Sequence, residues 1–205
     1  MVKIAGEKTD ESWRSLESKI KTDFDNATLW EQALDVFEER LNERYIKPAE
    51  EIQNNSSTSG EGFAIVTLLC SLIEALETFY EGKCFKCGQL RDKYDYGNGE
   101  SKPLYVSFLT KREPFNAAFN AGLAEDFYNN VRCALLHEAM TRNGWVIRAS
   151  SEGLVEEKDG KKCLNRNNFL REIKSYIKKY RKLVLGSKER KNAFIRKMKC
   201  ICDNS

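Results

Sequence analysis

The chain has 205 residues, of which 41% are hydrophobic and 32% are charged. This length fits one domain that buries a sizeable core, and this composition is typical of a soluble, helix-rich globular protein. The formal net charge of only +3 supports no electrostatic assignment by itself. The longest apolar run, residues 63–73, is too short to span a membrane, and residues 1–7 do not resemble a signal peptide. We therefore expect a cytoplasmic protein with no membrane partner.

Apolar residues at helical spacing predict three helices in the first half of the chain. The first covers residues 10–22, and a longer one begins at a Thr28 cap and runs to about residue 46. Pro48 is expected to kink or restart that helix, and residues 54–60 form a loop by composition. Residues 62–82 are hydrophobic on nearly every face, which predicts the central, buried helix.

The second half of the chain combines helices with a few strands. Residues 104–109 form a short helix or strand, and a helix then begins near Ala124 and is stopped by Asn143 and Gly144. Residues 145–148 alternate like a strand. Residues 154–164 contain Asp159-Gly160 between two short runs, which is a hairpin signal. We therefore expect a small antiparallel sheet within an otherwise helical chain.

Two basic helices are predicted to close the chain. Asn167 or Asn168 caps the first, whose buried face carries Phe169, Ile173, Tyr176, Ile177 and Tyr180, and Ser187 begins the second. The fold class is therefore mainly α, an antiparallel helical bundle with a small β-hairpin before the C-terminal helices. We expect a single domain over residues 1–205, with its core at about 28–185 and a basic C-terminal helix at 186–205.

Seven cysteines are scattered along the chain. Cys70 and Cys133 lie in apolar helical stretches and are interpreted as small buried hydrophobes. The pairs Cys84/Cys87 and Cys200/Cys202 leave two interpretations open, a zinc site made from both pairs or thiols that are close by chance. Neither spacing is matched by a proper second zinc knuckle, so we predict no metal and no cofactor, with this four-cysteine site as the weaker alternative.

Charged residues are distributed unevenly. Lysine and arginine dominate residues 158–199, where Asp159, Glu172 and Glu189 are the only acids. Such a segment is typical both of a nucleic-acid-binding surface and of a solvated helix face. Glu74 and Glu77 interrupt the apolar helix of residues 62–82. Glu77 falls on its buried face, where it either pairs with Arg132 or edges the helix into solvent.

The most unusual stretch is residues 127–140. At 100° per residue, one arc of this helix carries Phe127, Tyr128, Val131, Leu135 and Ala139, and Arg132 falls inside the same arc. An arginine in an apolar stripe requires an anionic partner from this chain, a second chain or a ligand. His137, the only histidine, lies about 140° further round. The two residues form either a structural pair or a site that handles a phosphate.

The segment 127–138 resembles the HEPN superfamily of helical nucleotide- and RNA-binding domains. The resemblance lies in the Arg132-Cys-Ala-Leu-Leu-His137 spacing and in the close of the segment at residues 143–145. The resemblance implies a helical bundle that forms a homodimer, so that both Arg/His pairs line one cleft. Family ribonucleases cut RNA without metal, through attack of a ribose 2′-hydroxyl on the adjacent phosphate. It implies that His137 and Arg132 are the catalytic pair, and we expect Glu77, Glu74 and Cys133 to lie around them as supporting residues.

The resemblance makes a cytoplasmic HEPN-like endoribonuclease, a toxin or anti-phage defence component, the first functional hypothesis. Its partners would be RNA and a cognate antitoxin or regulator. Two positions depart from the family: Cys133 replaces a residue that is often polar in active members, and Ala139 replaces a tyrosine of members paired with nucleotidyltransferase antitoxins. The alternative is a non-catalytic module that binds RNA, a nucleotide or a protein. The RNA backbone would be guided by Lys174, Lys178, Lys179 and Arg181.

Overall fold

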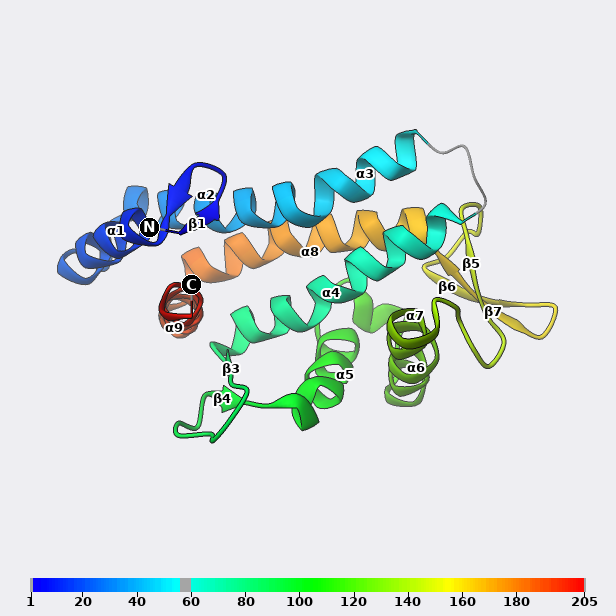
Figure 1. Ribbon diagram of the computed structural model, residues 1–205. Helices are drawn as coiled ribbons and strands as arrows, with labels where there is room; N and C mark the ends of the chain where they lie inside the picture. Colours follow the sequence, from blue (N-terminus) through cyan, green and yellow to red (C-terminus); the bar gives the residue numbers. More distant parts are fainter. Residues whose placement is uncertain (1, 56–59, 205) are drawn as a thin grey trace. The chain divides into compact units, whose positions relative to one another are not determined.

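The computed structural model describes residues 2–55 and 60–204, and the chain is mainly helical, as the sequence predicted (Figure 1). The chain divides into two compact units, and the expected single domain over residues 1–205 stays a prediction. Unit 1 comprises Met1–Arg44, Thr78–Asn98 and Ile177–Ser205, and unit 2 comprises Tyr45–Glu77 and Gly99–Tyr176. Two long helices, α4 (Glu61–Glu81) and α8 (Arg166–Gly186), contribute to both units.

Unit 1 begins with two short paired strands, β1 (Lys3–Ala5) and β2 (Lys8–Thr9), followed by α1 (Asp10–Thr22) and α2 (Ala27–Leu41). The helix α1 has the predicted bounds because Thr9 and Ser12 cap its first turn reciprocally. The helix α2 begins before the predicted Thr28, since the Asn26 side chain accepts a hydrogen bond from the Leu29 amide at 3.2 Å.

The core of unit 1 is aromatic. Phe194 of α9 (Lys188–Asp203) makes ring contacts with Trp13, Trp30, Phe37 and Phe79, at centroid distances between 5.8 and 6.4 Å. The helix α9 begins at the predicted Ser187 cap. Large aromatic side chains from four helices thus interlock, and such contacts add to the free energy gained from burial.

The chain does not break at Pro48. The π-helical segment η1 (Asn42–Ile46) leads directly into α3 (Lys47–Asn54), with the proline in its first turn, where the missing amide hydrogen is least costly. Residues 56–59 of the predicted loop 54–60 lie outside the described residues. Asn54 itself belongs to α3, so the helix extends further than the composition indicated.

The helix α4 is the buried helix that the sequence predicted. Ile65, Val66, Leu69, Leu72 and Ile73 are all fully buried. By length and composition α4 could cross a membrane, but 61% of its most apolar window is buried inside the protein. The simplest physical account is a core helix. It ends at Gly82, whose φ of +71° is favourable only for glycine.

After α4 the chain forms two short parallel strands, β3 (Cys84–Phe85) and β4 (Asp95–Tyr96). The short 3-10 turn η2 (Asn98–Glu100) then leads into α5 (Ser101–Lys111), which resolves residues 104–109 as helix. A second 3-10 turn, η3 (Phe115–Ala117), follows.

The helix that carries Arg132 has three parts, α6 (Ala121–Phe127), the π-helical segment η4 (Tyr128–Cys133) and α7 (Ala134–Glu138). We call it the motif helix. It begins before the predicted Ala124, because Asn120 caps it by accepting a hydrogen bond from the Leu123 amide at 2.8 Å. It also ends before Asn143, since Ala139 is left-handed with a φ of +54°.

A three-stranded sheet follows, formed by β5 (Trp145–Arg148), β6 (Val155–Lys158) and β7 (Lys161–Asn165) in the order β5-β7-β6. The hairpin between β6 and β7 turns at Asp159 and Gly160, as predicted, and both residues have positive φ. The expected all-antiparallel sheet is wrong, because β5 pairs with β7 in parallel. The chain passes from β5 to the opposite edge strand, and the hairpin then places β7 in the middle.

The helix α8 begins one residue before the predicted caps. The Asn165 side chain accepts hydrogen bonds from the backbone amides of Asn167 and Asn168, at 2.9 and 3.0 Å, so the cap is the last residue of β7. The predicted buried face of α8 is confirmed, since it carries five buried residues, Phe169, Ile173, Tyr176, Ile177 and Tyr180.

Candidate functional site

Arg132 has partners in its own chain. Its guanidinium carbon lies 5.4 Å from the centre of the Tyr128 ring, and its Nη2 atom lies 3.8 Å from Oε2 of Glu74. The Arg132 and Glu74 side chains are 23% and 19% exposed, so this ion pair lies at the edge of the protein. The arginine is therefore compensated by one aromatic face and one loosely held carboxylate.

The inner neighbours of Arg132 are thiol and phenol side chains. Its Nη1 lies 4.0 Å from Sγ of Cys133. Deeper in unit 2, burial raises the pKa of the Cys70 thiol to about 12 and raises the pKa of Tyr105 well above its usual value. Burial works against the charged form of Arg132, but Tyr128 and Cys133 together keep its pKa above its ordinary value. Arg132 therefore remains a cation beside these thiol and phenol side chains.

The apolar stripe around Arg132 is confirmed in part. Phe127, Val131 and Leu135 are buried, but Ala139 is exposed because the motif helix has already ended there. The π-helical segment η4 contains one residue more per turn than the regular helix on which the stripe was drawn. The side chains after residue 128 therefore lie at different angles around the helix axis from those predicted for a regular helix.

His137 lies at the solvent-exposed end of α7. Within the described part of the chain it makes no hydrogen bond and no ion pair, and no interaction joins it to Arg132. Its sequence neighbours Leu136 and Met140 are also exposed, at 50% and 49%. The exposed end of the motif helix thus carries an imidazole and two apolar side chains that are close in sequence.

Glu77 does not pair with Arg132 and does not reach solvent, so neither expectation for it holds. It is fully buried. Arg112 donates hydrogen bonds from Nε and Nη2 to its two carboxylate oxygens, both at 2.8 Å, and Ser107 donates a third at 2.7 Å. This bidentate pair joins α5 to α4, and Glu74 is the carboxylate that meets Arg132 instead.

Asp126 is a positioning residue that the sequence reasoning missed. It accepts hydrogen bonds from Trp145 Nε1 at 2.8 Å, Lys162 Nζ at 2.7 Å, Asn130 Nδ2 at 2.8 Å and Asn143 Nδ2 at 3.2 Å. Burial raises the pKa of its carboxyl, but these donors outweigh burial and leave the pKa below its usual value. Asp126 thereby fixes the motif helix to the sheet. The signal available in the sequence was that Asp126 and Asn130 are four residues apart, a spacing that lets their side chains meet on one helix face.

The four predicted RNA-binding cations all belong to α8. Lys174 lies in unit 2 and forms an ion pair with Glu50. The other three lie in unit 1, where Arg181 is surrounded by carboxylates and lies 2.9 Å from Asp35. Lys178 and Lys179 are exposed. Ion pairs with carboxylates of the same chain thus offset at least Lys174 and Arg181, which weakens the expected attraction for a phosphate backbone.

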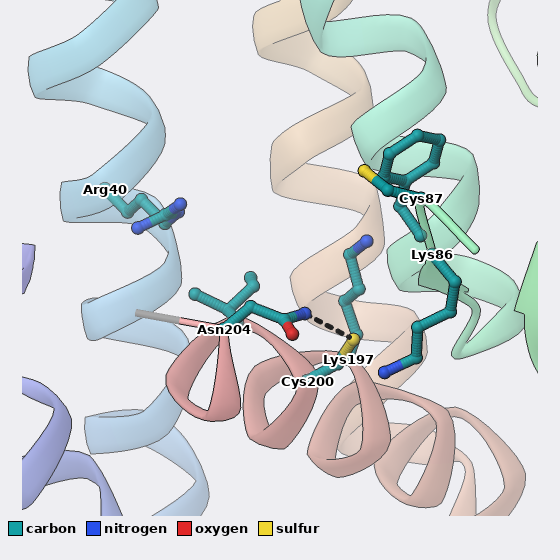
Figure 2. A pocket seen from close by; sticks show the side chains of 8 residues that line it. Arg40, Lys86, Cys87, Lys197, Cys200 and Asn204 are labelled. Carbon is teal, nitrogen blue, oxygen red and sulfur yellow. Dashed lines mark hydrogen bonds between the residues drawn. The ribbon is translucent and has the colours of Figure 1, made fainter. Parts of the chain in front are cut away.

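The four cysteines of the zinc alternative do not assemble. Cys84 and Cys200 line one pocket together, and Cys87 lines a cavity with Cys200 (Figure 2). Cys202 faces elsewhere, near Arg14, and burial raises the pKa of its thiol to about 11. Across residues 2–55 and 60–204 no group of three or more metal-binding side chains could hold a metal ion.

Around the motif helix, the chain therefore combines a partly exposed guanidinium, an exposed imidazole and exposed apolar side chains. A guanidinium stabilises charge on a phosphate, and an imidazole transfers protons near neutral pH. Comparisons with protein-family models, with curated proteins and with solved structures give no match for this chain.

Proposed function

We propose that this protein is a HEPN-type, metal-independent endoribonuclease that acts as a homodimer, with Arg132 and His137 as its catalytic pair. The observation that carries the proposal is the exposed end of the motif helix. There His137 lies between Leu136 and Met140, five residues after a partly exposed Arg132. A single chain leaves this surface uncovered, and a second copy would both bury it and bring a second Arg/His pair to the same cleft.

The proposed reaction is a transesterification within RNA. His137 removes the proton from a ribose 2′-hydroxyl, whose oxygen attacks the adjacent phosphorus. The bond from phosphorus to the 5′-oxygen of the next nucleotide breaks, and that oxygen takes up a proton. The products are a 2′,3′-cyclic phosphate and a 5′-hydroxyl. Arg132 stabilises the negative charge that builds on the phosphate oxygens.

The geometry around Arg132 suits such a role. Glu74 holds the guanidinium at 3.8 Å, longer than a direct hydrogen bond, so an RNA phosphate can replace the carboxylate without breaking a tight pair. The Tyr128 ring continues to support the guanidinium from below. Leu136 and Met140 are already about half buried, so covering the rest in the dimer would contribute roughly 0.8–1.5 kcal/mol for each side chain.

A second candidate is a non-catalytic HEPN-like module that binds RNA, a nucleotide or a protein. The contacts of Arg132 with Glu74 and Tyr128 favour it, because they satisfy the arginine without any ligand. Cys133, the residue after the arginine, also fits this candidate. The two candidates share a fold and differ in chemistry, so cleavage assays separate them. A role as a toxin or defence component, with a regulator that restrains the activity, goes with the first candidate, the endoribonuclease.

The test is incubation of the purified protein with mixed RNA in the presence of a chelator. Wild type is compared with Arg132→Ala, His137→Ala and the control Arg142→Ala, whose arginine pairs with Glu138 near the same exposed end. We expect cleavage to 2′,3′-cyclic ends by wild type and control, and none by the other two. RNA binding without cleavage favours the second candidate. A monomer that neither cleaves nor binds RNA or nucleotide refutes the nuclease proposal.

A further inference from the structure

Two thiols that are far apart in the sequence meet in unit 1. Cys84 begins strand β3, and Cys200 lies in the last turn of α9. Gly82 permits this approach, since a Cβ atom at that position would lie 2.8 Å from the Ala193 Cα of α9. The Cys84 sulfur lies 3.9 Å from the Arg196 carbonyl, one helical turn before Cys200. Strand β3 is thereby held against the helix turn that carries the second thiol.

The environment separates the roles of the two thiols. The Asn204 amide donates a hydrogen bond to the Cys200 sulfur at 3.6 Å (Figure 2), and the Cys84 thiol, which donates to the Arg196 carbonyl, lines a second pocket together with Cys200. The neighbouring Cys84 thiol, together with Lys197 and Lys86, lowers the pKa of Cys200 to about 7, while Cys200 and burial raise the pKa of Cys84. Cys200 is therefore the nucleophile, and Cys84 keeps its proton until a later step.

Cys200 opens into a cavity of about 560 Å³ (Figure 2). Three cationic side chains, Arg40, Lys86 and Lys197, line it, and the lining contains no carboxylate among the described residues. Phe85 and Ile201 supply apolar surface. A cavity of this size holds a small molecule, and its charge favours an anionic one.

We propose that Cys84 and Cys200 form an oxidisable dithiol site whose substrate is an anionic low-molecular-weight disulfide bound in this cavity. The Cys200 thiolate attacks one sulfur of the substrate, which forms a mixed disulfide and expels the other half as a thiolate. The Cys84 sulfur then attacks Cys200, its proton passes to the departing thiolate, and the second half leaves. The chain loses two electrons and two protons, the substrate disulfide is reduced to two thiols, and one Cys84–Cys200 disulfide forms.

The site is independent of the proposed ribonuclease activity. Its thiols, its cavity and the cations around them all belong to unit 1, whereas Arg132 and His137 belong to unit 2. Failure of either proposal therefore leaves the other unaffected, and each can be measured without the other.

The experiment compares two probes of opposite charge, oxidised glutathione and cystamine. Formation of the Cys84–Cys200 disulfide is followed by peptide mass spectrometry, and each rate is divided by that for free cysteine with the same probe. This ratio removes the intrinsic reactivity of the two disulfides. At low salt we expect a preference of about tenfold for oxidised glutathione, because the cations attract one probe and repel the other. The preference should shrink in high salt and in Lys86→Gln but not in Lys83→Gln, whose lysine pairs with Glu81.

Two cysteine variants test the order of the steps. Cys84→Ser should accumulate a glutathione adduct on Cys200, and Cys200→Ser should form neither adduct nor disulfide at Cys84. Cys202→Ser, altered on the same helix but outside the cavity, should react like wild type. The proposal is overturned if the disulfide joins Cys87 to Cys200, if no disulfide forms, or if the two probes show equal normalised rates.

Discussion

The buried pair of Glu77 and Arg112 is the interaction whose loss should be most costly. Replacing Glu77 with leucine leaves the Arg112 guanidinium, which is 14% exposed, without its two carboxylate hydrogen bonds. Removal of one partner of a buried ion pair costs about 3–5 kcal/mol. For a chain of this length, that corresponds to a fall in melting temperature of roughly 6–20 °C.

The assay is thermal and urea unfolding followed by circular dichroism. The double variant Glu77→Leu/Arg112→Met should recover most of the lost free energy of unfolding, since an apolar pair of similar size contains no buried charge. Glu74→Gln is the matched control on the same helix. Its ion pair with Arg132 is partly exposed, so its removal should cost no more than about 1 kcal/mol. The reasoning is refuted if Glu77→Leu is no more destabilising than Glu74→Gln, or if the double variant is no more stable than the single one.

Four further predictions concern the site, the sheet and the thiols. His137→Ala should abolish RNA cleavage but change the free energy of unfolding by less than about 0.5 kcal/mol, because the ring is exposed; equal losses of stability and activity would contradict it. Leu136→Asp should raise the dissociation constant of the dimer in sedimentation experiments, and an unchanged value would argue against this interface. The pKa of Asp126 is lowered on folding from 3.8, so its stabilising effect should be complete above that pH and be lost as the pH falls below it, through the lower pKa of the folded state; measured relative to its own stability at neutral pH, wild type should therefore lose more stability below pH 3.8 than Asp126→Asn, and equal losses would contradict this reasoning. The rate of Cys200 alkylation by iodoacetamide should rise with pH to half its maximum near 7, and in Cys84→Ser this midpoint should move upward, toward 9.0; an unchanged midpoint would show that Cys84 is not the main cause.

Local signals in the sequence predicted where two of the helices begin. Thr9 and Ser187 are followed by the residues whose amides their side chains cap, and both helices begin where expected. The buried face of α8 was equally clear from its period. Such features depend on residues within one or two turns of each other, so a single sequence contains all the information needed.

Long-range features could not be predicted in this way. The partner of Glu77 is Arg112, 35 residues away, and an arginine at position 132 satisfied the sequence pattern equally well. The order β5-β7-β6 also depends on how the chain crosses the sheet rather than on the composition of any strand. The meeting of Cys84 and Cys200 requires Gly82 at the end of α4, a packing requirement that cysteine spacing does not reveal.

The π-helical segment η4 has a consequence for the evolution of this helix. A wide turn of this kind is equivalent to one extra residue accommodated in an ordinary helix, so a shortened chain could close the turn without losing the helix. Deletion of Asn129, an exposed residue, would then close the wide turn and leave the flanking parts of the motif helix facing as before, whereas the same deletion in a regular helix would rotate everything before it by about 100°. Single-residue insertions and deletions at this position are therefore a route by which related chains could differ in length while keeping the faces of α6 and α7.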